Sequence, residues 1–412
     1  MLSKMPAIPY FEVLVNGEFL TAYASRVEII QKTNSHPVAL LDVEYVGQLI
    51  AQGGKGIRNS WTYLKEQTPI AINYGMKPNY LGQFLGYVAS YQFLRSGTDI
   101  GSNGLKTTCV RYTIVGTSQI MQSTKNVAWK NTSISTIASS IAVKNGFRAV
   151  IHPYTQAITY RLQNVSDFKF LSELADEIGY RFYVDNTDLY FVNPRLILDQ
   201  SNLRSVPEFW SYNTPGLYDT IRKFSPIVGT ITPDGGIVAN RTVSGINTET
   251  GNVLTATTPY NTFMNPDGSP IAPTITKYYN QRPVDTYYEA KQKLAGDINN
   301  NIYWITADCE LYGDFRVKPN TLVEFYGNSL PSTEAGRWLV QSATHIINMP
   351  APTGSKVDAD YTICAEVVRD QYYAATTVTV PASTSAVIQK VPPALVGGTW
   401  RSSNVGAQIH AS

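Results

Sequence analysis

Histidine and cysteine side chains are the groups best able to ligate a transition metal or to pair as nucleophile and base. The chain has four histidines and three cysteines: His36, His152, His345, His410, Cys109, Cys309 and Cys364. Their spacing matches no metal-binding pattern, and each cysteine lies in a run of alternating polar and apolar residues. We therefore expect buried free thiols, structural or exposed histidines, and neither a metal ion nor another cofactor.

Paired carboxylates are the other common catalytic arrangement, and Glu173, Asp176 and Glu177 lie close together in the sequence. Glycoside hydrolysis requires two such groups held across a cleft. At helical spacing these three instead lie opposite an apolar stripe, where charged groups solvate the outer face. No G-x-S-x-G, H-E-x-x-H or complete phosphate-loop motif occurs, and the glycines of residues 52–60 indicate a flexible loop. The sequence therefore predicts no catalytic residue.

Composition favours a β-rich protein with a weakly charged surface. Charged residues are 16% of the chain, the net charge is +2, and 27 residues are tyrosine. This balance lacks the basic patch of a nucleic-acid-binding protein. It is typical of subunits in permanent assemblies, although a monomeric β protein would also expose tyrosines. No secretory signal and no run of about 18 apolar residues is present, so we expect a cytoplasmic origin and no membrane insertion.

Two strand-rich regions lie near the two ends of the chain. In the first, apolar residues alternate up to Asn16-Gly17, a strong signal for a two-residue hairpin. Several similar runs follow before residue 120, and another dense set lies between residues 303 and 370. Each set predicts a small antiparallel barrel or sandwich.

Between these regions the apolar period changes to that of helices, and two helices followed by a hairpin are predicted. Ser166 is expected to cap the second helix, and residues 180–192 to form the hairpin. The expected core and end positions are Ile137, Ile141 and Gly146 for the first helix and Phe168, Leu171, Leu174, Ile178 and Gly179 for the second.

Three further segments carry specific expectations. A helix near residues 285–298 should begin at Asp285 and bury Tyr287, Leu294 and Ile298. In the strand of residues 336–347, strict alternation places Trp338 and His345 on opposite faces, and both are expected to be packing residues. The last 40 residues lack a period but contain apolar residues such as Trp400, so we expect this tail to dock on a neighbouring chain.

Several of these segments together resemble the phage baseplate hub family, which comprises the late control gene D proteins and the hub part of type VI secretion spike proteins. The helix and hairpin SDFKFLSELADEIGYRFYVDNTDLYFVNP resemble the family's linker segment. FLGYVASYQF resembles a strand of its first barrel, and ISTIASSIAVKNGF its first linker helix. YGDFRVKPNTLVEFYG and GRWLVQSATHII resemble its second barrel. Two departures are a loop insertion near residues 250–283 and the lack of a spike module after residue 372.

The resemblance implies a structural virion protein rather than an enzyme. It implies a homotrimer in which two similar barrels per chain make a ring of six, which adapts a six-fold tail tube to a three-fold spike. The implied partners are the tail tube or distal tail protein, the spike or tip protein, baseplate wedge proteins and the tape measure protein. DNA would only pass through the channel, and assembly would take place in the cytoplasm of the host bacterium.

The expected fold class is therefore mainly β with an α+β insert, in which two tail-tube-like barrels flank a helix-plus-hairpin domain. The expected domains are residues 1–122, residues 123–200, residues 201–372 and the tail 373–412, and strands near 205–230 are candidates to complete the first of them. Two other functions remain open at this point: a tail-associated cell-wall hydrolase, and a module that binds carbohydrate or a receptor.

Overall fold

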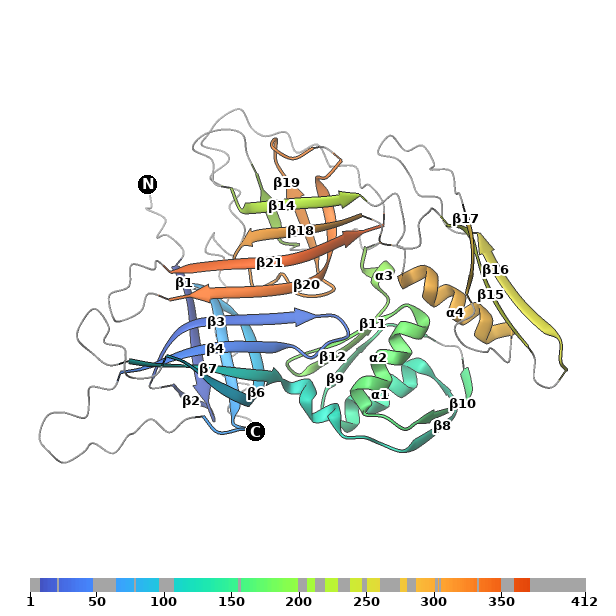
Figure 1. The fold of residues 1–412 in the computed structure, drawn as a ribbon, viewed down its shortest axis with the longest axis horizontal. Coiled ribbons are helices and arrows are strands. Elements are labelled where there is room, and N and C mark those ends of the chain that lie inside the picture. Colours follow the sequence, from blue (N-terminus) through green and yellow to red (C-terminus); the bar gives the residue numbers. More distant parts are fainter. Residues whose placement is uncertain are drawn as a thin grey trace, which may run out of the picture.

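The computed structural model places most of the strands in one large sheet, with a helical unit packed against it (Figure 1). It describes residues 8–20, 22–46, 64–77, 79–95, 107–154, 157–198, 206–211, 219–228, 238–246, 250–259, 275–279, 287–300, 303, 305–331, 333–349 and 359–370. The prediction of a mainly β fold with an α+β insert is confirmed. The predicted tail of residues 373–412 and the loop of residues 52–60 lie outside the described residues.

The N-terminal half is a set of antiparallel strands that lie side by side in the order β3-β4-β7-β6-β5-β1-β2. Asn16 and Gly17 both have positive φ, 51° and 84°, and join the first two strands in the predicted hairpin. The strands are β1 (Ile8–Val15), β2 (Glu18–Phe19), β3 (Tyr23–Lys32), β4 (Val38–Val46), β5 (Pro69–Lys77), β6 (Asn79–Arg95) and β7 (Thr107–Gly116).

The C-terminal half contains six strands of the same sheet. They are β13 (Glu208–Trp210), β14 (Ile221–Val228), β18 (Ile305–Tyr312), β19 (Leu322–Tyr326), β20 (Gly336–Asn348) and β21 (Asp360–Arg369). Among these, β13 pairs with β19 and β14 pairs with β18. The expectation that strands near residues 205–230 complete the N-terminal half was therefore wrong, since they find their hydrogen-bond partners in the C-terminal half.

The two halves are joined by direct strand pairing. Strand β3 pairs with β20 from Lys32 opposite Ser342 to Arg26 opposite Asn348. The described strands thus form one open path that runs from β14 through β21, β20, β3 and β4 to β1 and β2. Within that path no described pairing closes either half into a separate barrel. Buried side chains of both halves also belong to a single hydrophobic core.

Strand β20 differs from the expected alternation because it contains a bulge. The register with β21 shifts between Val340 and Ser342, which adds one residue and changes which face the following side chains occupy. Trp338 and His345 consequently lie on the same buried side, each fully shielded from solvent. The sequence placed them on opposite faces because strict alternation cannot anticipate a bulge.

The α+β unit consists of the 3-10 helix Thr117–Gln122 and the elements that follow it as far as residue 198. Ser133 and Ser166 cap the two long helices by accepting hydrogen bonds from the N–H groups of Thr136 and Lys169. The elements are β8 (Val127–Ser133), α1 (Ile134–Lys144), β9 (Arg148–Ile151), β10 (Ala157–Gln163), α2 (Asp167–Ile178), β11 (Arg181–Asp185), β12 (Asp188–Val192) and α3 (Pro194–Leu198). Strands β8 and β10 form a ribbon, and β11, β12 and β9 form a small mixed sheet.

A further three-stranded sheet lies beside this unit, on the side far from β1 and β2 (Figure 1). It contains β15 (Val238–Ile246), β16 (Val253–Pro259) and β17 (Ile275–Tyr279), and it is packed against α4 (Tyr287–Asn300). Helix α4 buries Ala290 and Leu294, but Tyr287 is 46% exposed, contrary to expectation. Asp285 lies outside the described residues, as does the side chain of Ile298.

Helix α4 approaches α2 closely because residue 296 has no side chain. A Cβ atom at Gly296 would lie 2.1 Å from the backbone oxygen of Glu177. We expect Gly296→Ala to lower the free energy of unfolding by about 1–3 kcal/mol, since the helices must move apart. Urea denaturation would measure this, with the exposed neighbour Ala295→Ser as control. An equally small effect of both substitutions would contradict the close helix contact.

A three-way junction as the candidate functional site

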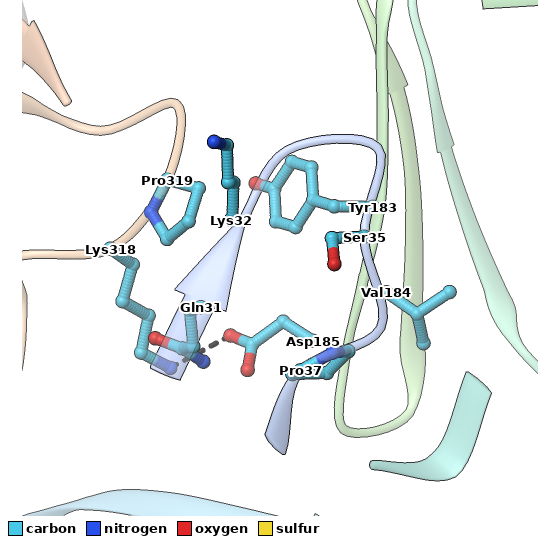
Figure 2. Close-up of a pocket in the computed structure, with 9 residues that line it drawn as sticks. All are labelled: Gln31, Lys32, Ser35, Pro37, Tyr183, Val184, Asp185, Lys318 and Pro319. Carbon is cyan, nitrogen blue, oxygen red and sulfur yellow. Dashed lines mark hydrogen bonds and ion pairs between the residues drawn. The ribbon is translucent and has the colours of Figure 1, made fainter. Parts of the chain in front are cut away.

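Three parts of the chain meet around Lys318. They are the β3–β4 turn, the β11–β12 hairpin of the α+β unit, and the loop between β18 and β19 (Figure 2). The Lys318 ammonium donates to Asp185 at 2.7 Å, and the two side chains are only 20% and 16% exposed. The small cavity beside them is about 10 Å³, room for roughly one water molecule, so this site is a structural contact rather than a ligand pocket.

Electrostatics favour a charged lysine at this position. Burial lowers the pKa of the Lys318 amine, but Tyr74 and Asp185 raise it by more, and the net pKa lies above the ordinary value. Burial also raises the pKa of Tyr74 to about 12, so this tyrosine is neutral at pH 7. Asp185 is therefore the counter-charge of Lys318 under ordinary conditions, and it comes from a different part of the fold.

His345 continues the junction into the core of the large sheet. Its ring nitrogens lie 2.9 Å from the Val317 carbonyl oxygen and 2.8 Å from the Tyr361 hydroxyl. The ring centre is 5.4 Å from that of Tyr74, which belongs to the other half of the sheet. Burial, followed by the charge of Lys318, lowers the pKa of His345 to about 3. The imidazole is therefore neutral and shares its environment with residues of both halves.

The tip of the β11–β12 hairpin binds the backbone of the N-terminal half. Asn186, at a φ of 55°, accepts a hydrogen bond from the Leu85 N–H at 2.8 Å and donates to the Gln83 carbonyl at 2.9 Å. Its own carbonyl accepts from the Thr117 hydroxyl. One asparagine side chain thus satisfies a donor and an acceptor of β6 at once, as a neighbouring strand would.

The β3–β4 turn makes the reciprocal contact. Asn34, at a φ of 56°, donates its N–H to the Phe182 carbonyl at 2.8 Å and accepts from the Phe182 N–H at 3.1 Å. Its amide also donates to Asp176 at 2.8 Å. His36 of the same turn stacks on Phe168, with ring centres 3.7 Å apart. Backbone and side-chain contacts therefore fix the α+β unit against the sheet from two directions.

The residues predicted as important lie in two separate cores. Trp338 is in the large core, and the buried His345 contacts that core through Tyr74 and Tyr361. The helix positions form the core of the α+β unit. Gly146 and Gly179 follow α1 and α2 with positive φ values of 78° and 68°. Trp400 lies outside the described residues. The α+β core includes Ile137, Ile141, Phe168, Leu171, Leu174 and Ile178, each at most 8% exposed.

The other polar candidates are distributed over the fold. Among the carboxylates, Asp176 binds Asn34 and Glu177 pairs with Arg161 at 2.7 Å. All three cysteines are free, but only Cys309 is buried, since Cys109 is partly buried and Cys364 is exposed; this corrects the expectation of three buried thiols. Cys364 is exposed because strand alternation directs its side chain to the outer side of β21. His410 lies outside the described residues.

The residues that make the junction were not identified from the sequence. Lys318, Asp185 and Asn186 come from loops whose turn chemistry was visible, but their partners are more than 90 residues away. Positive φ at Asn34 and Asn186 is a local signal for a turn, not for a contact. Only the three-dimensional arrangement brings these side chains together.

The described part of the chain lacks two features that would indicate a metal site or a membrane-spanning helix. In it, no group of three or more histidine, cysteine or acidic residues could hold a metal ion. No helix within the described ranges has the length and apolar character needed to cross a bilayer. What the junction can do chemically is hold three parts of the fold in fixed positions.

Solved structures share this architecture over most of the chain. The tail protein from Neisseria meningitidis MC58 matches with a TM-score of 0.60 at 10% identity, covering 90% of this chain and 98% of that one. The 43 kDa tail protein of prophage MuSo2 from Shewanella oneidensis matches with a TM-score of 0.59 at 12% identity, covering 88% and 98%. A chain of the lidded Francisella PdpA-VgrG complex matches at 0.50 and 10% identity, covering 90% of this chain and 54% of that one.

No protein-family model matches the sequence, and no curated protein is similar enough in sequence to count as a relative. At such low identities the structural matches establish the fold. The fold of this chain is therefore similar to that of two tail proteins, one of them from a prophage.

Proposed function

We propose that this chain is a structural protein of a phage tail, and that it forms the trimeric hub of the baseplate or tail tip. The observation that carries the proposal is the fold, which two tail proteins share along nearly their entire length. The sequence resemblance to the hub family supports the same assignment. The protein would then belong to the virion and assemble in the cytoplasm of the host.

The arrangement of the two halves supports a hub in particular. Both halves contribute strands to one sheet and side chains to one core, so each subunit would present two strand-rich surfaces in a fixed relation. Three subunits would then supply six such surfaces to a six-fold tail tube or distal tail protein, and a three-fold arrangement to a spike or tip protein. Wedge and tape measure proteins would be further neighbours.

The Lys318 junction has a specific task in this proposal. It would hold the α+β unit as a brace between the two halves, so that their spacing matches the repeat of the tube. A net charge of +2 agrees with a channel through which DNA passes without being bound. A hydrolase would require two carboxylates held across a cleft, and the cavity beside Lys318 is lined by only one, Asp185.

We expect the purified full-length protein to form a trimer, with a mass three times the 45.5 kDa of one chain. Light scattering coupled to size-exclusion chromatography measures this directly across a range of protein concentrations. Electron microscopy of the same sample should show a ring with a central opening. A stable monomer at high concentration, or a particle without three-fold symmetry, would contradict the hub proposal.

A further inference from the structure

The turn between β1 and β2 contains an asparagine followed by glycine, a sequence that is chemically reactive. Asparagine loses its side-chain amide fastest before glycine, because glycine has no side chain to hinder its own backbone nitrogen and lets the backbone rotate. The chain contains three such pairs: Asn16-Gly17, Asn103-Gly104 and Asn145-Gly146. The second lies outside the described residues, and the fold gives the first and the third opposite environments.

Asn16 lies in an open environment. Both Asn16 and Gly17 are exposed to solvent. Among the described residues, none forms a hydrogen bond with the Asn16 side-chain amide or with the Gly17 N–H. A Cβ atom at Gly17 would lie more than 4 Å from every atom beyond the adjacent residues of the chain. The amide and the glycine nitrogen are therefore accessible to each other and to water.

The backbone of this turn is weakly held. Asn16 has a φ of 51°, and its backbone must rotate before its Cγ atom can meet the Gly17 nitrogen. Strand β2 is two residues long, pairs with β1 at Leu14 and Val15, and lies at the end of the large sheet (Figure 1). The Phe19 side chain is 68% exposed, so little apolar burial opposes opening. Short exposed elements of this kind open at a small free-energy cost while the rest of the fold stays intact.

Asn145 is also followed by glycine, but hydrogen bonds hold both reacting groups. Its side-chain amide donates to the Ile141 carbonyl at 2.9 Å and to the Asp167 carboxylate at 3.1 Å. The Gly146 N–H donates to the Val143 carbonyl at 3.0 Å. Asp167 is 1% exposed and is the first residue of α2. Reaction at Asn145 therefore requires the end of α1 to separate from α2.

We propose that Asn16 is a site of spontaneous deamidation in the folded protein, whereas the fold protects Asn145. The Gly17 nitrogen gives its proton to solvent and attacks the Cγ atom of Asn16. A bond forms between this nitrogen and Cγ, the bond between Cγ and Nδ2 breaks, and ammonia leaves after taking a proton from solvent. Nothing is oxidised or reduced, and the product is a cyclic imide. The inference does not depend on the proposed role in a phage tail.

Water then opens the imide at either of its two carbonyl carbons. Addition at Cγ gives aspartate, whereas addition at the backbone carbonyl carbon gives isoaspartate, in which the main chain runs through Cβ and Cγ. Isoaspartate lengthens the turn by one methylene, which does not fit a two-residue hairpin loop with both residues at positive φ. Strand β2 should then separate from β1, while β1 stays paired with β5 from Ile8 to Val15.

Peptide mapping of the full-length protein by mass spectrometry tests the site of reaction. The folded protein is incubated at mildly alkaline pH in water that carries a heavy oxygen isotope, which marks the product formed during the incubation. We expect Asn16 to convert at least about fivefold faster than Asn145, with both aspartate and isoaspartate formed from it. A smaller difference, or no conversion of Asn16, overturns the proposal.

The unfolded protein provides the matched control. In concentrated urea the two asparagines should convert at similar rates, since both precede glycine and neither keeps its hydrogen bonds. A difference in rate that persists in urea arises from the neighbouring sequence, and it overturns the protective role of the fold.

The variant Asn16→Gly tests the structural consequence. Glycine adopts the positive φ of this turn but has no amide to lose. We expect chymotrypsin to cleave after Phe19 faster in aged than in fresh wild-type protein, and at an unchanged rate in aged and fresh Asn16→Gly. An equal effect of ageing on the two proteins overturns the opening of the hairpin by deamidation.

Discussion

Replacing Asp185 by asparagine is expected to lower the free energy of unfolding by about 3 kcal/mol, because it leaves the ammonium of Lys318 buried without a counter-charge. The two side chains are only 20% and 16% exposed, so solvent compensates for little of the lost interaction. Chemical denaturation monitored by tryptophan fluorescence would measure the change. Because Lys318 and Asp185 are both largely buried, substituting one of them can be compared with substituting both.

Removing both charges should be far less costly than removing one. We expect the double variant Asp185→Leu/Lys318→Met to lie within about 1.5 kcal/mol of the wild type, since apolar side chains of similar volume often replace a buried pair without penalty. The matched control is the Arg148–Asp188 pair, in which the Arg148 side chain is 73% exposed. Arg148→Met should change the stability by less than about 1 kcal/mol. Equal effects at the two pairs would contradict a special role for the junction.

Acid should destabilise the protein through His345. The unfolded chain takes up a proton on this histidine near pH 6.5, whereas the folded protein does so only near pH 3. Between these values the unfolded state binds more protons, so stability falls as the pH is lowered, by up to about 1.4 kcal/mol for each pH unit. The contribution is fully present above pH 6.5 and is progressively lost below it.

The substitution His345→Gln isolates this effect from the titration of carboxylates. Glutamine does not titrate but can still donate to the Val317 carbonyl and accept from the Tyr361 hydroxyl. We expect a lower stability at pH 7 and a shallower loss between pH 6 and pH 4 than in the wild type, measured as the melting temperature at each pH. His152 serves as the comparison histidine, because partial burial lowers its pKa as well. Identical pH profiles for wild type and His345→Gln would contradict the assignment of the acid destabilisation to His345.

Local features of the fold could be predicted where one short stretch of chain determines them. The serine caps, the buried stripe of α2 and the turn at Asn16-Gly17 depend on residues within a few positions of each other. The fold class followed from the same patterns. Burial of Cys364 and Tyr287 was mispredicted because periodicity shows that a strand or helix has two sides but not which residues at its margins are covered.

Features that depend on distant partners could not be predicted. A single extra residue in β20 moves His345 to the same side as Trp338, and periodicity contains no signal for it. The pairing of β14 with β18 and of β3 with β20 joins segments with no sequence relation to each other. The sequence around Lys318 also contains no signal of its contact: a lysine before proline in a loop does not indicate that Asp185, 133 positions earlier, will be its partner.

The pairing of β3 with β20 has a consequence for biosynthesis. Strand β3 leaves the ribosome roughly 300 residues before the strand that will cover its edge. At a translation rate of about 5–20 residues per second, the edge of β3 stays unpaired for about 15–60 seconds before β20 is synthesised. During translation the nascent N-terminal half therefore exposes a strand edge that can aggregate. The yield of the protein in cells should depend on chaperones that shield this edge until synthesis ends.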